Sequence, residues 1–365
     1  WADKGAKVII NGGTYVNTAK NGDDHYDLIY ADRNSTIEIY GGTFINVTPK
    51  WTLNCKDYTN SKIYVMGGRY FRFDPSDVKT TPKAKEGFED PTEVIVPEGY
   101  EVIKDGEWYE VRLAEGKFGA GTGAYDDFND AITNASNKGN VKVTLPANAS
   151  VELKNGVANE DTKARDLTFV GDGTQTVDVV SKAINAEGGM LNYQRGSKFT
   201  FKNMTVQAGE GAFDGIVCDE LVYDNCVIRG KLTLFGKATF INCTFENDMA
   251  NQYSVWTWGG TDVLFESCTF NTNGKAILLY GQATAAKPTN LTVNNCTFND
   301  RNDGSAGKAA IEIGNDYNAT YTLTINNITV NGFANGKNTN SKVWANKNSM
   351  DAEHLTVTID ETKVH

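Results

Sequence analysis

Four segments in the second half of the chain repeat one pattern: Asn225-Cys226-Val227-Ile228, Asn242-Cys243-Thr244-Phe245, Ser267-Cys268-Thr269-Phe270 and Asn295-Cys296-Thr297-Phe298. They recur at spacings of 17, 25 and 28 residues, and the segments 202–206 and 327–330 are further members. Short equivalent strands separated by loops of variable length are typical of a chain that winds into a solenoid, with one turn of chain per repeat. The pattern therefore predicts an all-β solenoid for this part of the chain.

The first two residues of each segment have predicted positions in such a solenoid. If each Asn lies at a corner, its amide can hydrogen-bond the equivalent residues of the repeats above and below. The next residue then points inward, so that Cys226, Cys243, Cys268 and Cys296 form one column. Parallel strands lie ~4.8 Å apart, which overlaps the Cα separation of a disulfide, so pairing is sterically conceivable. We expect buried thiols that act as small apolar groups.

A second repeat, centred on a Gly-Gly pair, occupies the beginning of the chain. Its members span residues 8–15, 37–44 and 63–70, and their glycine pairs are 29 and 26 residues apart. The residues before each pair alternate with the period of a strand that has one buried face, and Glu38 marks the outer side. We therefore expect residues 1–73 to be the C-terminal part of a truncated solenoid.

The region between the two repeat arrays differs from both. Residues 74–97 contain Pro75, Pro82, Pro91 and Pro97 and predict a loop. The Asp-Gly pair within residues 99–111 is flanked by alternating residues and predicts a β-hairpin. These features assign residues 74–119 to a linker made of a loop and a hairpin.

A short helix is expected at the start of the remaining domain, residues 120–365. Thr122 stands at an N-cap position, and Tyr125, Phe128, Ile132 and Ala135 follow helical spacing. A strand then begins at Val141. A helix across the open end of a solenoid would shield its first repeat.

These elements resemble a known fold family. The helix, the strand that ends in Leu145-Pro146 and the Asn-Cys-Thr-Phe repeats resemble right-handed parallel β-helices of the pectate-lyase-like type, over nearly all of residues 120–365. The Gly-Gly repeats, Phe73-Asp74-Pro75 and the hairpin are similar to modules of gut-bacterial surface proteins and of phage virion or tail proteins. The resemblance implies a right-handed parallel β-helix in two parts and an extracellular location, on a bacterial cell surface or a phage virion. It implies no particular chemistry, because a fold does not carry a function.

Composition and charge exclude several classes of function. The chain has 365 residues, with 38 Asn and 36 Gly, and its 35 Lys and Arg against 46 Asp and Glu leave a net charge of −11. This charge argues against a nucleic-acid partner, which needs clustered cations, and favours a neutral over an acidic glycan. No apolar run is long enough to predict a membrane span. Six cysteines without a CxxC pair and three histidines predict no metal site and no cofactor. Because the chain opens at Trp1 and reaches a strand pattern by Val8, we expect it to be a piece of a longer protein.

Candidate catalytic groups are sparse. The ordered motif set of polygalacturonase-like enzymes does not occur in the sequence, and Asp126-Asp127 is interpreted as charge at a helix N-terminus. His25, His354 and His365 are scattered, without a recognisable nucleophile partner. Two groups could converge on adjacent repeats, and solvated charge on an acidic solenoid explains both: Asp214, Asp219, Glu220 and Arg229, and Lys308, Glu312 and Asp316.

Aromatic residues near the centre of the second array suggest a sugar-stacking surface. Trp256, Trp258 and Tyr280 are the candidates, together with Glu312 and Asp316 as polar ligand-binding residues. Aligning the repeats on four glycines gives one column of Phe235, Trp258, Tyr280 and Ile313 and a neighbouring column of Leu234, Thr257, Leu279 and Glu312. Because an unpaired Glu is seldom buried, the Glu312 column should face outward and the Trp258 column should lie in the core.

These observations favour a non-catalytic, elongated module of a bacterial adhesin or a phage fibre that presents a surface to a cell-surface glycan or receptor. A homotrimer or assembly with other fibre or virion subunits is expected. The alternative is a polysaccharide lyase or glycoside hydrolase with its groove along one sheet, and a third possibility is a purely architectural spacer.

Overall fold

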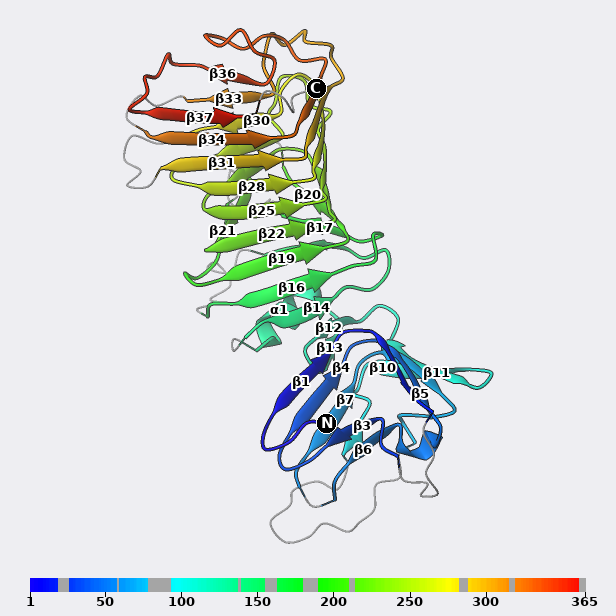
Figure 1. The fold of residues 1–365 in the computed structure, drawn as a ribbon. Coiled ribbons are helices and arrows are strands. Elements are labelled where there is room, and N and C mark those ends of the chain that lie inside the picture. The colour runs from blue at the N-terminus through cyan, green and yellow to red at the C-terminus, as the bar shows by residue number, and fades with distance from the viewer. Residues whose placement is uncertain are drawn as a thin grey trace. The chain divides into compact units, whose positions relative to one another are not determined.

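The computed structural model describes residues 1–18, 26–57, 59–77, 93–136, 139–154, 163–179, 190–209, 214–281, 288–314 and 319–360. Across these ranges the chain is nearly all β, and the helices are the short α1 (Phe128–Asn134) and a 3-10 turn, η1 (Pro49–Trp51). The chain divides into two compact units, Trp1–Ala131 and Ile132–His365. The predicted all-β class is confirmed, and long parallel sheets in the second unit are compatible with a β-solenoid (Figure 1).

Unit 1 is built from the Gly-Gly repeats, each of which gives one strand before the glycines and one after them. One sheet is parallel throughout, in the order β1 (Lys7–Ile10), β4 (Thr36–Ile39), β7 (Lys62–Val65) and β9 (Val94–Ile95). A second sheet has the order β10 (Tyr100–Asp105), β11 (Trp108–Leu113), β8 (Gly68–Phe71), β5 (Thr43–Asn46) and β2 (Thr14–Asn17). The remaining strands are β3 (Ile29–Ala31) with β6 (Leu53–Cys55), and the antiparallel pair β12 (Phe118–Ala120) with β13 (Gly123–Tyr125).

The core of unit 1 follows the predicted alternation. Ile10, Ile39 and Val65 are paired in register and buried, and the rings of Tyr15, Phe44 and Tyr70 stack with centroids 5.1 and 4.8 Å apart. The second glycine of each pair has a positive φ, as at Gly42 (+125°), where a side chain would be strained. Glu38 lies on the other face, as expected, but it is only 8% exposed, and its Oε1 lies 2.8 Å from Lys7 Nζ.

The predicted hairpin is confirmed as the antiparallel pair β10–β11 around Asp105-Gly106. It does not stand apart from the repeats, since β11 pairs antiparallel with β8. In the structure the hairpin that we assigned to a linker thus extends a sheet of unit 1. Most of the preceding loop, residues 78–92, lies outside the described residues.

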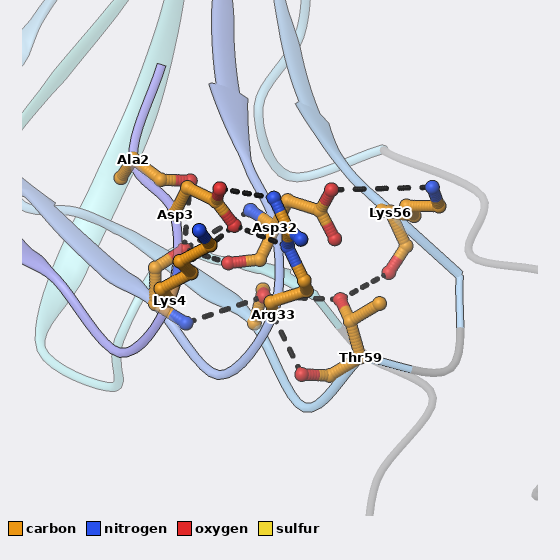
Figure 2. Close-up of polar contacts among 9 residues, drawn as sticks. Ala2, Asp3, Lys4, Asp32, Arg33, Lys56 and Thr59 are labelled. Atoms are coloured by element: carbon orange, nitrogen blue, oxygen red, sulfur yellow. Dashed lines mark hydrogen bonds and ion pairs between the residues drawn. The ribbon is translucent and has the colours of Figure 1, made fainter.

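Charged side chains join successive repeats along one edge of unit 1 (Figure 2). The Arg33 Nε–H donates to Asp3 Oδ1 at 2.5 Å, and Lys56 Nζ lies 3.9 Å from Asp32 Oδ2. The hydrogen bond from Arg33 holds the pKa of the Asp3 carboxyl below its ordinary value. Each pair joins residues at least 24 positions apart in sequence, so these contacts fix neighbouring repeats to one another.

Unit 2 contributes three parallel sheets, which we name A, B and C. Sheet A has the order β14 (Val141–Thr144), β16 (Asp166–Val170), β19 (Lys198–Lys202), β22 (Glu220–Asp224), β25 (Lys237–Ile241), β28 (Asp262–Glu266), β31 (Thr289–Asn294), β34 (Tyr321–Asn326) and β37 (Leu355–Ile359). Sheet B has the order β15 (Ser150–Glu152), β17 (Thr176–Asp178), β20 (Thr205–Gln207), β23 (Val227–Arg229), β26 (Thr244–Glu246), β29 (Thr269–Thr272), β32 (Thr297–Asp300) and β35 (Thr329–Asn331). Sheet C has the order β24 (Leu232–Leu234), β27 (Val255–Thr257), β30 (Ile277–Leu279), β33 (Ile311–Ile313) and β36 (Trp344–Asn346), and β18 (Met190–Asn192) pairs separately with β21 (Gly215–Val217).

The core of unit 2 lies between sheets A and B. Fully buried aromatic rings stack along sheet A from Phe201 to Tyr223 and Phe240, and along sheet B from Phe245 to Phe270 and Phe298. Rings of the two stacks also meet, as at Phe240 and Phe245. Each strand is too short to bury its apolar face alone, so the stacking of repeats makes one continuous core.

The predicted corners are confirmed. Asn203, Asn225, Asn242, Ser267, Asn295 and Asn327 all have φ between +52° and +56°. The Asn225 amide donates to Asn203 Oδ1 at 2.8 Å, and the Asn327 amide donates to Asn295 Oδ1 at 2.7 Å. The four cysteines that follow these corners are buried and are free thiols.

The helix is confirmed but begins later than expected. Gly123–Tyr125 is strand β13, and the cap of α1 is Asp127, whose Oδ1 accepts the backbone N–H of Asn129 at 2.8 Å. The predicted cap at Thr122 is therefore wrong, because the carboxylate satisfies the first free N–H groups of the helix. At the other end, the buried Arg165 guanidinium donates to Thr133 O at 2.9 Å and to Ala135 O.

Candidate functional site

The middle residues of the sheet C strands form one column. Thr233, Trp256, Leu278, Glu312 and Ala345 lie side by side in register. The residues flanking them in β27, β30 and β33 are fully buried. Because successive side chains of a strand point to opposite faces, the column lies on the face of sheet C directed away from those buried residues. We call the face that carries Trp256, Leu278 and Glu312 the outer face.

An aromatic cluster stands on the outer face and at the end of its strands. Trp258 and Tyr280 are stacked, with centroids 4.9 Å apart and planes 9° apart, and both meet Trp256 edge-on at 5.9 and 5.7 Å. All three side chains are partly exposed. The Trp256 Nε1–H is buried and has no hydrogen-bond partner among the described residues.

This arrangement corrects the predicted core position of Trp258. The buried column is Leu234, Thr257 and Leu279, whereas Phe235, Trp258 and Tyr280 are partly exposed. The alignment failed at the fourth repeat, where Leu279 pairs with Ile313 and not with Glu312. A shift of one residue moves every side chain of a strand to the opposite face. The column that we had expected to face outward is therefore the buried one, and the column of Trp258 is the exposed one.

Glu312 is nevertheless a partnered carboxylate. It is only 2% exposed, it accepts a hydrogen bond from the Tyr253 hydroxyl, and its Oε1 lies 3.3 Å from Lys308 Nζ. Burial and the negative charge of Glu312 raise the pKa of the Tyr253 phenol. One of the two groups predicted from the sequence was Lys308, Glu312 and Asp316. The structure brings Lys308 and Glu312 together, as predicted, and Asp316 lies outside the described residues.

Three further lysines lie close to these groups. Lys275 Nζ and Lys347 Nζ are 5.1 and 5.9 Å from the centre of the Tyr253 ring, and Lys231 Nζ is 4.5 Å from the centre of the Trp256 ring. Burial lowers the pKa of Lys231, Lys275 and Lys347. Tyr253, Lys231, Lys275 and Lys347 were missed by the sequence analysis, because they lie outside the strands and follow no repeat spacing.

A groove of about 560 Å³ lies near the start of the sheet A strands. Its lining includes Phe235, which follows β24, and polar residues before or at the start of the sheet A strands, among them Arg195, Asp219, Lys237 and Asn290.

The other predicted group, which consists of Asp214, Asp219, Glu220 and Arg229, does not form a site of its own. Of its members, Asp219 lines this groove, Glu220 pairs with Lys237 at 2.8 Å, and Arg229 lines a different groove of about 790 Å³. Asp214 is buried and acts on Lys231 through its charge.

The histidines and the Asp pair give no catalytic constellation in the part of the chain that the structure describes. His354 Nδ1 lies 2.8 Å from Asp351 Oδ1, and His25 and His365 lie outside that part. Asp126 pairs with Lys117 at 2.6 Å, and Asp127 caps α1. Within the described ranges there is no cluster of His, Cys, Asp or Glu that could hold a metal, and no helix there is long and apolar enough to span a membrane.

Comparisons of the chain with protein-family models, curated proteins and solved structures found no match.

Proposed function

We propose that this chain is a non-catalytic module of a bacterial cell-surface adhesin or a phage tail or virion fibre, and that it binds a glycan on the outer face of sheet C. We further propose that its stacked sheets belong to a right-handed parallel β-helix. One observation supports this fold: successive strands in sheets A, B and C are parallel. Crossovers between parallel strands of one sheet are almost always right-handed.

The aromatic cluster is the observation that carries the proposal. Trp256, Trp258 and Tyr280 are large apolar side chains kept out of a core that is filled by other aromatic rings. The flat pair formed by Trp258 and Tyr280 offers the kind of surface on which the apolar face of a pyranose ring stacks. Clustered apolar side chains left partly exposed are a general mark of a binding surface.

Binding of the full chain to a glycan array and titration of each positive glycan test the proposal. We expect Trp258→Ala to weaken binding at least tenfold, since an aromatic residue at the centre of an interface often contributes about 2 kcal/mol or more. Trp108→Ala is the matched control, because this Trp lies on the hairpin of unit 1. An equal loss of glycan affinity in both variants would contradict a binding site at the aromatic cluster, and so would unchanged affinity in Trp258→Ala.

A polysaccharide lyase or glycoside hydrolase is the second candidate, favoured by the buried Glu312 with its phenol and ammonium neighbours. Hydrolysis ordinarily needs two carboxylates on either side of the scissile bond. In the described residues, the groups that contact Glu312 are Tyr253 and Lys308. Reproducible depolymerisation of a glycan that is lost in Glu312→Gln would overturn the non-catalytic proposal.

The fibre form of the proposal also predicts assembly. A trimer by light scattering fits it, whereas a monomer at all concentrations favours a module displayed singly. Glycan arrays and cell-binding assays that stay negative would instead favour an architectural spacer.

A further inference from the structure

The lysine cluster of the outer face consists of Lys275, Lys308 and Lys347. Lys308 Nζ lies 3.3 Å from Glu312, and the other two ammonium groups stand over the ring of Tyr253, which itself hydrogen-bonds Glu312. Among the described residues, Glu312 is the carboxylate that contacts Lys308 and whose charge acts on Lys275 and Lys347. The local excess of positive charge is opposite in sign to the net charge of −11 for the whole chain.

This arrangement is electrostatically costly as it stands. The Lys308 side chain is 33% exposed, and Lys275 and Lys347 are also partly buried, although lysines elsewhere readily extend their charged ends into water. Burial is the main cause that lowers the pKa of Lys275 and Lys347; neighbouring ammonium groups lower it further, whereas the charge of Glu312 raises it. One carboxylate cannot neutralise three cations, so an additional anion would stabilise the cluster.

The lysine cluster lies near the aromatic cluster, and Leu278 and Glu312 between them are buried. Trp256 is paired with Leu278 and Leu278 with Glu312, so the two clusters are two strand spacings apart, or about 10 Å. A ligand of several sugar units could contact both.

We propose that Lys275, Lys308 and Lys347 bind the carboxylate or sulfate group of an acidic saccharide whose other rings stack on Trp258 and Tyr280. This inference rests on the proposed glycan-binding function and names the class of glycan. The net charge alone favoured a neutral glycan, but the charge at the outer face is the relevant quantity.

Calorimetric titration of the full chain with three matched probes tests the inference: a chondroitin sulfate hexasaccharide, its desulfated form, and the desulfated form with esterified carboxyl groups. The first two probes distinguish sulfate from carboxylate as the bound anion, and the third keeps the sugar without charge. We expect the neutral probe to bind at least tenfold more weakly than one of the charged probes, corresponding to the loss of one charge-assisted hydrogen bond.

The variant Lys347→Gln should weaken binding of the charged probe about tenfold and leave binding of the neutral probe unchanged. Lys202→Gln is the control, since Lys202 lies on sheet A and pairs with Asp224 at 3.0 Å. Without ligand, Lys347→Gln should unfold at the same or a higher temperature, because it removes repulsion between like charges. A lysine that only held the fold together would instead lower the unfolding temperature when replaced.

Unchanged affinity of Lys347→Gln for the charged probes would overturn the anion site, even if Trp258→Ala still abolished binding and thereby upheld the glycan surface. Equal binding of all three probes would overturn it as well. Failure of all three probes to bind would also count against the anion site, and neutral glycans would then remain the test of the proposed function.

Discussion

Ser267 occupies a corner at which its equivalents in the same column are asparagines. Its φ of +56° lies in the left-handed region, which costs most L-residues about 1–2 kcal/mol and costs Asn less. The corner amides also bond from one repeat to the next, as Asn225 does with Asn203. Next to Ser267, the Asn295 amide donates instead to Glu266 Oε1 at 2.7 Å.

We expect Ser267→Asn to stabilise unit 2 by about 0.5–1 kcal/mol, because asparagine tolerates the backbone conformation and can restore the amide contacts. For a unit of this size the unfolding temperature should rise by about 1–4 °C in scanning calorimetry. Asn225→Ser is the reverse control and should lower it by a similar amount. A fall in the unfolding temperature of Ser267→Asn would contradict this account of the corner.

At the scale of elements, the stacked rings of sheet B show how one strand depends on its neighbours. Phe270 of β29 stacks on Phe245 at 4.3 Å and on Phe298 at 4.6 Å, and it is fully buried. In an array of repeats, each repeat contacts chiefly the next one on either side. The loss of this ring should therefore be felt locally and strongly.

We expect Phe270→Ala to lower the free energy of unfolding of unit 2 by about 3–5 kcal/mol, the usual cost of emptying a buried aromatic site. Hydrogen exchange should speed up most in β26, β29 and β32 and least in β15 and β17. Phe270→Leu, which fills much of the space, should cost much less. Uniform loss of protection along all strands of sheet B would contradict nearest-neighbour coupling.

The predictability of these elements depended on whether local sequence determined their register. In sheets A and B, an apolar residue follows each Asn corner at a constant offset, so the strands, corners and buried thiols could all be predicted. Sheet C has three-residue strands between loops of unequal length, and there the alignment slipped by one residue at Glu312. The contacts of Tyr253, Lys275 and Lys347 depend on loops and could not be predicted from a repeat.

At the scale of the whole molecule, the two units differ in their expected response to pH. In unit 1, burial raises the pKa of the Glu93 carboxyl to about 7, with a further contribution from Asp57. In unit 2, hydrogen bonds from Asn295 and Asn294 lower the pKa of Glu266, and a hydrogen bond from Lys237 lowers that of Glu220.

These shifts have opposite signs. The folded state binds the Glu93 proton more tightly than the unfolded chain, so unit 1 should gain stability as the pH falls from about 8 through 7 toward 4.5. The carboxyls of Glu266 and Glu220, whose pKa is lowered in the folded state, stabilise unit 2 at pH values above their pKa in the unfolded chain. This stability is lost only as the pH falls through their lower folded-state pKa. Hydrogen exchange of β7 and β9 should therefore slow, relative to the intrinsic rate, between pH 8 and 5.5. In Glu93→Gln this pH dependence should disappear, and its persistence would contradict the assignment.

The asparagine ladders of unit 2 have a direction. Asn225 donates to Asn203, Asn299 to Asn271, Asn326 to Asn294, Asn327 to Asn295 and Asn331 to Asn299, so in each pair the later repeat donates to the earlier one. A column of amides aligned in this way has a polarity along the stacking axis, as the peptide groups of a helix do. A further repeat could continue such a column only with the same orientation, so these asparagine side chains favour parallel growth of the stack independently of its backbone.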